Sequence, residues 1–155
     1  MEEQLIAVVD GARARFFCVR ERGTPSGEQK NKLVEVETLI NPAHRIKDGD
    51  LFSETRPGQR KAFAGGPGHG VDDKRDAHAV EFDRKFAKLV LETMAKLIRA
   101  HSVTYAILAA GPLMLGHLRE HRHLLPRVEI GELPKHLTEL TPHQLCLRLE
   151  ADELI

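Results

Sequence analysis

The sequence predicts a single α/β domain with a mixed five-stranded sheet and flanking helices. Three segments near the amino end have the patterns of antiparallel strands, and later segments alternate between helical and strand patterns. Strands joined by short turns pair antiparallel, whereas strands joined through a helix pair in parallel. The 155 residues, 41% of them hydrophobic, suffice for one packed domain, which we predict to span residues 1–155.

The first three strands are indicated by apolar runs around a turn. Residues 5–9 are an apolar run, apolar character resumes in 14–19 with Phe16 to Val19, and Asp10-Gly11 lies between the two segments. Asp-Gly favours a tight hairpin because both residues tolerate a positive φ. Residues 33–39 then alternate between apolar and polar side chains, which is typical of a strand with one solvated face. These segments predict an antiparallel meander.

A long segment with few large apolar side chains follows the meander. We predict a Gly-rich loop from about 41 to 75, with Gly65-Gly66-Pro67-Gly68 towards its end. Loops of this length are uncommon in compact domains and are usually functional or disordered. Function is therefore expected here first, and a floppy insert is the alternative.

The rest of the chain alternates between helices and strands. Asp72, Asp73 and Asp76 are the N-cap candidates of a long amphipathic helix that ends near His101. Thr141 is the expected cap of the last helix. Four further elements are predicted from pattern changes and prolines: a buried strand at 103–110, a helix at 113–125, a strand at 128–133 and a helix at 142–149.

Charge and cysteine content exclude several classes of protein. The chain has 23 Lys and Arg against 23 Asp and Glu, so any affinity for nucleic acid must come from a local patch. Cys18 and Cys146 match no metal or redox spacing, and we expect reduced thiols of an intracellular protein. No export signal or spanning segment is recognisable, so we expect a soluble, cytoplasmic protein without membrane contact.

Cations and glycines are concentrated between residues 55 and 71, where Asp and Glu are absent. This composition suits contact with a nucleic-acid backbone, because glycines permit close approach and cations release counterions. A solvated loop that needs charge for solubility is the alternative. The candidate RNA- or ribosome-binding residues are Arg56, Arg60, Lys61, Gly65, Gly66 and His69, with Arg13 and Arg15 as secondary basic candidates.

A metal site receives less support from the sequence. His117 and His121 are four residues apart on a predicted helix, with His123 close behind, and two imidazoles on one face could bind zinc. Two ligands do not make a site, so surface histidines are the simpler interpretation and no metal or cofactor is predicted. Asp10 ends a strand, where metal-dependent nucleases carry acids, but it is more simply the hairpin residue.

Several stretches of the sequence together carry a resemblance to a known family. Residues 8–17 read VVDGARARFF, Asn41-Pro42 is followed by Arg56-Pro57-Gly58, and residues 109–119 read AAGPLMLGHLR. In this order the chain resembles, almost end to end, the bacterial "host attachment protein" family. That family is described as proteins required for attachment to host cells and is grouped with bacterial-archaeal release-factor-like proteins.

The resemblance implies a fold similar to the middle domain of archaeal and eukaryotic class-1 peptide-chain release factors, which is ribonuclease-H-like. In those factors a loop before the long helix carries Gly-Gly-Gln, which helps water attack peptidyl-tRNA in the ribosome. Here the comparable loop carries Gly65-Gly66-Pro67. Pro67 lacks the backbone N–H that could donate to a water or an oxyanion, so hydrolysis by that mechanism is not expected.

Three functions stay open at this point. A non-catalytic RNA- or ribosome-binding module related to translation factors is preferred, with the ribosome or a structured RNA as its partner. The alternative is an attachment-related or regulatory protein that acts through protein partners. A hydrolase on the same frame ranks third, because it would need acids gathered around a metal ion.

Overall fold

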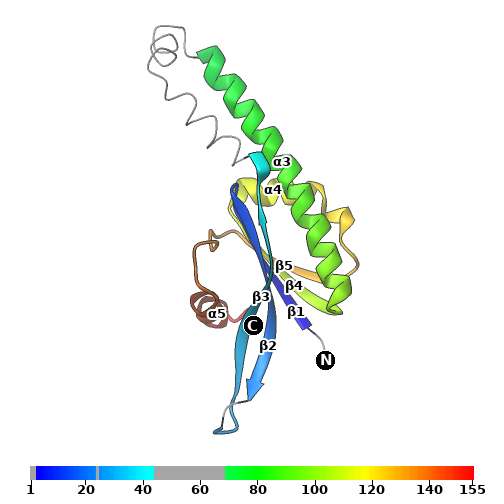
Figure 1. Cartoon of the computed structure of the whole chain (residues 1–155), viewed down its shortest axis with the longest axis vertical. Helices are drawn as coiled ribbons and strands as arrows, with labels where there is room; N and C mark the ends of the chain where they lie inside the picture. Colours follow the sequence, from blue (N-terminus) through cyan, green and yellow to red (C-terminus); the bar gives the residue numbers. More distant parts are fainter. Residues whose placement is uncertain (1–2, 24, 44–68) are drawn as a thin grey trace.

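The computed structural model describes residues 3–23, 25–43 and 69–155, with side chains in the last range described from residue 78. These residues form one α/β domain with a mixed five-stranded sheet, as predicted (Figure 1). The elements in chain order are β1 Glu3–Val9, β2 Arg13–Gly23, β3 Gln29–Ile40, α3 His69–Ala100, β4 Val103–Ala110, α4 Pro112–Glu120, the 3₁₀ turn η1 Arg122–Leu124, β5 Glu129–Leu133 and α5 Pro142–Ala151.

Strand β1 joins the antiparallel and parallel halves of the sheet. The strand order is β3-β2-β1-β4-β5. β1 and β2 pair antiparallel, as do β2 and β3, whereas β4 pairs in parallel with both β1 and β5. Leu5 of β1 therefore lies between Cys18 on one side and Ala106 on the other. The predicted mixture of pairings is confirmed.

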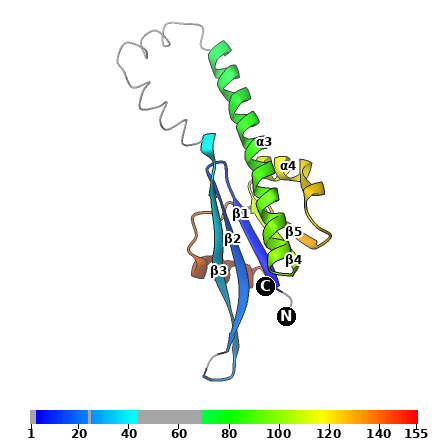
Figure 2. The same ribbon diagram turned by 45° about the vertical axis from the view of Figure 1, so that its right-hand side comes forward.

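Both faces of the central strands are buried under helices. Because side chains alternate along a strand, Leu5 and Ala7 face α3 and α4, whereas Ile6 and Val8 face α5. Figures 1 and 2 show α3 and α4 on one side of the sheet and α5 on the other. This double cover explains why β1 and β4 are continuous apolar runs.

The turn between β1 and β2 is a hairpin, as predicted, but for a different reason. Neither Asp10 nor Gly11 has a positive φ. Oδ1 of Asp10 instead accepts hydrogen bonds from the backbone N–H groups of Ala12 at 2.7 Å and Arg13 at 2.8 Å. The backbone N–H of Asp10 donates to the carbonyl of Arg13 at 2.9 Å. The carboxylate, and not left-handed backbone, holds this turn.

Helix α3 begins earlier than the sequence suggested. It begins at His69, so the predicted end of the loop near residue 75 is wrong, and Asp72, Asp73 and Asp76 lie inside the helix and are not its N-cap. The predicted end is confirmed, because α3 stops at Ala100. Its 32 residues span about 48 Å, and none of the helices in the described ranges is long and apolar enough to cross a bilayer.

The last two helices differ in how well they were predicted. The helix predicted at 113–125 ends at Glu120, and η1 follows after His121. The cap of α5 is confirmed. Thr141 Oγ1 accepts from the backbone N–H of Gln144 at 3.1 Å, and the Gln144 side chain accepts from the backbone N–H of Thr141 at 3.0 Å. This reciprocal pair is a capping box, which satisfies two amide groups that the helix itself cannot.

Both cysteines are free and buried in the core, on opposite faces of the sheet. Burial is the main cause that raises the pKa of the Cys18 thiol to about 11, and the negative charge of Glu3 adds to it. Burial is also the main cause that raises the pKa of the Cys146 thiol to about 11, and a hydrogen bond with Glu150 and the charge of that residue add to it. A buried neutral thiol behaves as a small apolar residue.

We predict that the protein loses stability in mild alkali partly through these thiols. The folded thiol of Cys146 holds its proton up to about pH 11, whereas an unfolded thiol loses it near 9.0. The contribution is therefore fully present below pH 9 and is lost as the pH rises towards 11. From pH 8 to pH 10, wild type should lose about 1 kcal/mol more than Cys146→Ala in urea unfolding. Equal losses in the two proteins would contradict the prediction.

Candidate functional site

A cavity lies where strands β1 and β4 end. It has a volume of about 210 Å³ and is lined by Asp10, Gly11, Asp83, Gly111, Pro112, Leu113, Met114 and His136. We call it the carboxyl-edge pocket. Ligands of α/β sheets bind at the carboxyl ends of parallel strands, where the strand order reverses direction. β1 is that point here, because the chain continues from it to β2 on one side and pairs with β4 on the other.

Gly111 shapes one wall of this pocket. It follows β4 and precedes Pro112, the first residue of α4. A Cβ atom at Gly111 would lie 2.3 Å from Cε1 of His136, so the imidazole packs against a residue without a side chain. Any other residue at position 111 would push His136 away. The glycine therefore permits the histidine of the β5–α5 connector to stand over the end of β4.

Asp10 connects the pocket to the same connector. Its Oδ2 accepts a hydrogen bond from Oγ1 of Thr138 at 2.5 Å, and Thr138 is only 3% exposed. Both carboxylate oxygens of Asp10 are thus engaged, one in the turn and one across the fold. Asp83 of α3 lines the opposite side, with its Oδ1 3.6 Å from the position of a Cβ on Gly11.

The rim of the pocket combines charge with an apolar side chain. Leu113, in the first turn of α4, is 86% exposed. Two carboxylates and one imidazole face the same cavity. His136 can exchange hydrogen bonds with a bound group, and Leu113 offers it an apolar contact.

The secondary basic candidates Arg13 and Arg15 bind the protein's own backbone. Arg13 Nη2 donates to the carbonyl of Thr138 at 2.8 Å. Arg15 Nη1 donates to the carbonyls of Thr138 at 3.0 Å and Leu140 at 2.7 Å. The two guanidinium groups therefore fasten the β5–α5 connector to the meander, and their contact with phosphate stays a prediction.

Arg15 also makes a bidentate pair on the sheet surface. Its Nε and Nη2 donate to the Glu35 carboxylate at 2.9 and 3.1 Å, and its guanidinium carbon lies 5.0 Å from the ring centre of Phe17. The hydrogen bonds from Arg15 are the main cause that lowers the pKa of Glu35. Only 13% of the Arg15 side chain is exposed, so it offers little surface to a partner.

The predicted phosphate-binding segment cannot be placed from the described residues. Arg56, Arg60, Lys61, Gly65 and Gly66 lie outside them. His69 is the first residue of α3, but its side chain is also outside the described part. The role of these residues therefore stays a prediction from composition.

The histidines of the predicted second helix end up on separate elements. His117 is in α4, His121 follows its last turn, and His123 is in η1. The rings of His121 and His123 have centroids 6.3 Å apart. Within the ranges with described side chains, these histidines do not join a third metal-ligating side chain.

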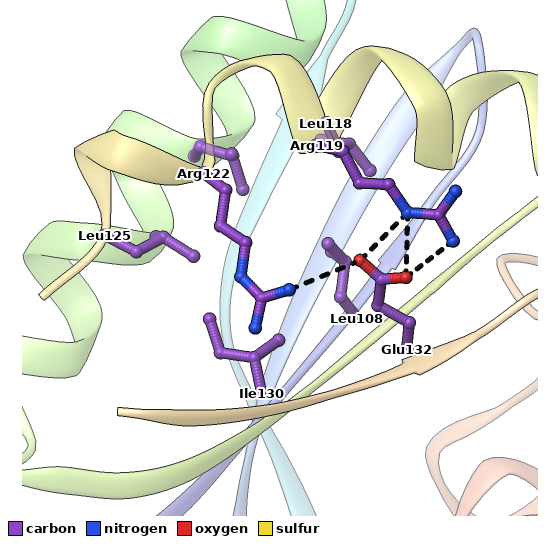
Figure 3. A pocket seen from close by; sticks show the side chains of 8 residues that line it. Leu108, Leu118, Arg119, Arg122, Leu125, Ile130 and Glu132 are labelled. Atoms are coloured by element: carbon purple, nitrogen blue, oxygen red, sulfur yellow. Dashed lines mark hydrogen bonds and ion pairs between the residues drawn. The ribbon is translucent and has the colours of Figure 1, made fainter. Parts of the chain in front are cut away.

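A second depression, between α4 and β5, is closed by ion pairs (Figure 3). Glu132 lies between Arg119, whose Nη2 is 2.7 Å from Oε2, and Arg122, whose Nη1 is 3.8 Å from Oε1. Hydrogen bonds from Arg119 are the main cause that lowers the pKa of Glu132. The remaining volume of about 10 Å³ is enough for no more than one water. This depression is therefore a structural feature and not a ligand site.

Residues 5–149 match the model of a family described as "Protein required for attachment to host cells". The chain belongs to this family. The match confirms the host-attachment resemblance and connects the chain with attachment to host cells, while the likeness to release factors stays a prediction. No curated protein matches the chain.

Three stretches that carry the resemblance of this attachment-family chain meet at the carboxyl-edge pocket. One contains Asp10 and Gly11, and another contains Gly111, Leu113 and Met114. The third contributes Asn41, whose Nδ2 donates to the carbonyl of Gly11 at 2.8 Å. Asn41 is 4% exposed and therefore supports the pocket from behind.

Sequence reasoning missed Asp83, His136 and Thr138 as members of this site. Asp83 lies one helical turn before buried Phe86, at the border of the apolar stripe. A polar residue at such a border is a usable signal only once the neighbouring strand ends are known. His136 and Thr138 lie in a connector without periodicity, where no local pattern predicts a contact with Asp10.

Proposed function

We propose that this chain is a non-catalytic RNA- or ribosome-binding module of the cytoplasm, built on a ribonuclease-H-like frame similar to the release-factor middle domain. The mixed five-stranded sheet and the long helix that follows the meander agree with such a frame. The family described as required for attachment would then act through translation or RNA, and attachment would be an indirect result.

One observation carries the proposal: α3 extends beyond the sheet. Among its described side chains the first buried one is Phe86, although the helix begins at His69. Figure 2 shows the amino-terminal half of α3 projecting past the ends of the strands. A projecting helix of this length can reach into a site that the body of the domain cannot enter.

The charge distribution supports a local contact. The chain as a whole is neutral, so binding to phosphates requires a cluster of cations without acids. The sequence from 55 to 71, which runs into the first turn of α3, is such a cluster and contains Arg56, Arg60 and Lys61. Pro67 stands where the hydrolytic glutamine of the release-factor motif would be, which supports a binding role and not hydrolysis.

Co-sedimentation with ribosomes tests the proposal. Wild type is expected to sediment with ribosomes from the source cell at low salt and to be released at raised salt, because phosphate contacts exchange counterions. The variant with Arg56, Arg60 and Lys61 changed to Ala should lose about tenfold or more in affinity at low salt. Both proteins should keep the same melting temperature.

A charge-matched variant provides the control. Lys88, Lys96 and Arg99 are exposed on the half of α3 that covers the sheet, and changing all three to Ala alters the net charge equally. This variant should sediment like wild type. Wild type that stays at the top of the gradient at every salt concentration, or equal loss in the two triple variants, overturns the proposal.

A protein partner at the pocket rim is the second candidate function. It is favoured by the exposure of Leu113, at 86%, and by the family's description. An apolar contact of this kind is insensitive to salt. A complex that persists at raised salt and is lost in Leu113→Asp would favour this attachment-related or regulatory role.

A further inference from the structure

Three metal-ligating side chains meet at the end of the sheet opposite the carboxyl-edge pocket. Glu3 begins β1, Cys18 lies in β2, and His101 follows α3 directly. One ligand atom from each lies within 4.8 Å of the other two. Cys18 is fully buried, whereas the side chains of Glu3 and His101 are 30% and 27% exposed. The cluster therefore has a buried sulfur and a side that faces solvent.

The fold brings these residues together from distant parts of the sequence. The antiparallel register of β1 and β2 places Cys18 opposite Leu5. Glu3 lies two residues before Leu5 in β1, so its side chain is on the same face of the sheet. His101 ends the helical path, with its backbone N–H donating to the carbonyl of Leu97 at 3.0 Å. Ser102 then has φ 52°, in the left-handed region, and turns the chain into β4. That turn lays His101 over the start of β1.

The electrostatics of the cluster favour a cation. Nδ1 of His101 lies 3.2 Å from Oε2 of Glu3. This oxygen is buried, and within the described residues it accepts no hydrogen bond of good geometry. The carboxyl-terminal end of α3, which His101 follows, adds the partial negative charge of its last carbonyl groups. A buried carboxylate oxygen without a hydrogen bond is stabilised by a cation placed beside it.

We propose that Glu3, Cys18 and His101 form a binding site for one divalent transition-metal ion of the Zn²⁺ class. A thiolate, an imidazole and a carboxylate are the ligands that Zn²⁺ combines in proteins, whereas Mg²⁺ and Ca²⁺ prefer oxygen alone. Three protein ligands leave a fourth position for water or a ligand, on the solvent side. The proposal is independent of the RNA-binding function.

Metal binding here requires a small and defined change. Ligand atoms of a tetrahedral Zn²⁺ site lie roughly 3.3–3.8 Å apart, so the three atoms, now within 4.8 Å, need only side-chain rotations to close around an ion. The Cys18 thiol loses its proton to solvent and binds as thiolate. Nδ1 of His101, which now lies against Glu3, gives up its proton to solvent or to the other ring nitrogen and then binds the ion through its lone pair. Burial raises the pKa of this thiol, so the ion must displace the proton.

The test uses Co²⁺ as a spectroscopic probe on the full chain after treatment with a chelator. Co²⁺ bound to a thiolate shows a sulfur-to-metal charge-transfer band, and tetrahedral sites show intense visible bands. We expect one Co²⁺ per chain with both features, displaced by Zn²⁺, and a Zn²⁺-dependent rise in melting temperature. Cys18→Ser and His101→Gln should weaken binding by about a hundredfold or more.

Cys146→Ser is the matched control. Cys146 is also buried, also has a pKa raised to about 11 and also has a carboxylate neighbour, Glu150, with its Sγ 3.4 Å from Oε1. It has no place in the cluster, so its variant should bind Co²⁺ like wild type.

Two results overturn the proposal. One is a wild-type protein that shows no thiolate band at saturating Co²⁺, which identifies Glu3 and His101 as an ion pair and nothing more. The other is a band that persists in both Cys18→Ser and His101→Gln, which places the metal elsewhere. If Cys18→Ser does not fold, the wild-type spectrum and the His101→Gln variant still decide, because the His101 side chain is 27% exposed and its replacement leaves the buried core unchanged.

Discussion

Phe86→Ala is expected to lower the free energy of unfolding by about 3–5 kcal/mol. Phe86 is 2% exposed and packs in the core between α3 and the sheet, with Leu91 and Met94 of the same helix. Truncation removes its apolar contacts and leaves a cavity at the place where α3 first meets the sheet. Urea unfolding at neutral pH, followed by circular dichroism, measures the loss.

Leu89→Ala is the control for this prediction. Leu89 lies on the same helix, only three residues away, but is 37% exposed. Its truncation should cost less than about 1 kcal/mol, because a half-exposed side chain loses fewer contacts and leaves no closed cavity. Equal losses for the two variants would contradict the described packing of α3 against the sheet.

Asp10→Ala is expected to cost about 2–4 kcal/mol. The carboxylate accepts two backbone hydrogen bonds in the β1–β2 turn and one from the buried hydroxyl of Thr138. Its removal leaves all three donors without this acceptor, and Thr138, which is 3% exposed, has little access to water. The unfolding midpoint in urea should fall without a change in the slope of the transition.

A double-mutant cycle isolates the long-range part of that loss. Thr138→Val removes the hydroxyl and keeps the shape, so Asp10→Ala should cost about 1–2 kcal/mol less in the Thr138→Val background than in wild type. A coupling energy near zero would show that Asp10 acts in the turn alone and does not hold the connector.

The sequence predicted which segments form helices and which form strands, but it predicted the boundaries of some elements more accurately than those of others. The β4 strand agrees at both ends, because its apolar run is bounded by the end of α3 and by Gly111-Pro112. The second and third strands were predicted too short. Their outer parts pair polar residues such as Arg20 with Lys32, where no alternation of apolar side chains signals a strand.

The candidate sites were less predictable, because they depend on contacts over long sequence separations. The residues around Arg13 and Arg15 in the sequence do not show whether these cations lie at the surface or bind backbone carbonyls 125 residues away. The same holds for Cys18, whose neighbours Glu3 and His101 come from different elements. Spacing motifs detect sites made by one helix or turn and do not detect sites made by strand register.

The position of β1 at the centre of the sheet has a consequence for synthesis of the chain. β1 pairs with β2 through a short turn, but its other edge has no partner strand until residues 103–110 have been synthesised. At about 5–20 residues per second, roughly 5–20 s pass before β4 is made. During that time an apolar edge from Leu5 to Val9 stays open on the nascent meander, and such edges pair readily with other strands. The nascent chain is therefore vulnerable to aggregation until the parallel strands β4 and β5 have been synthesised.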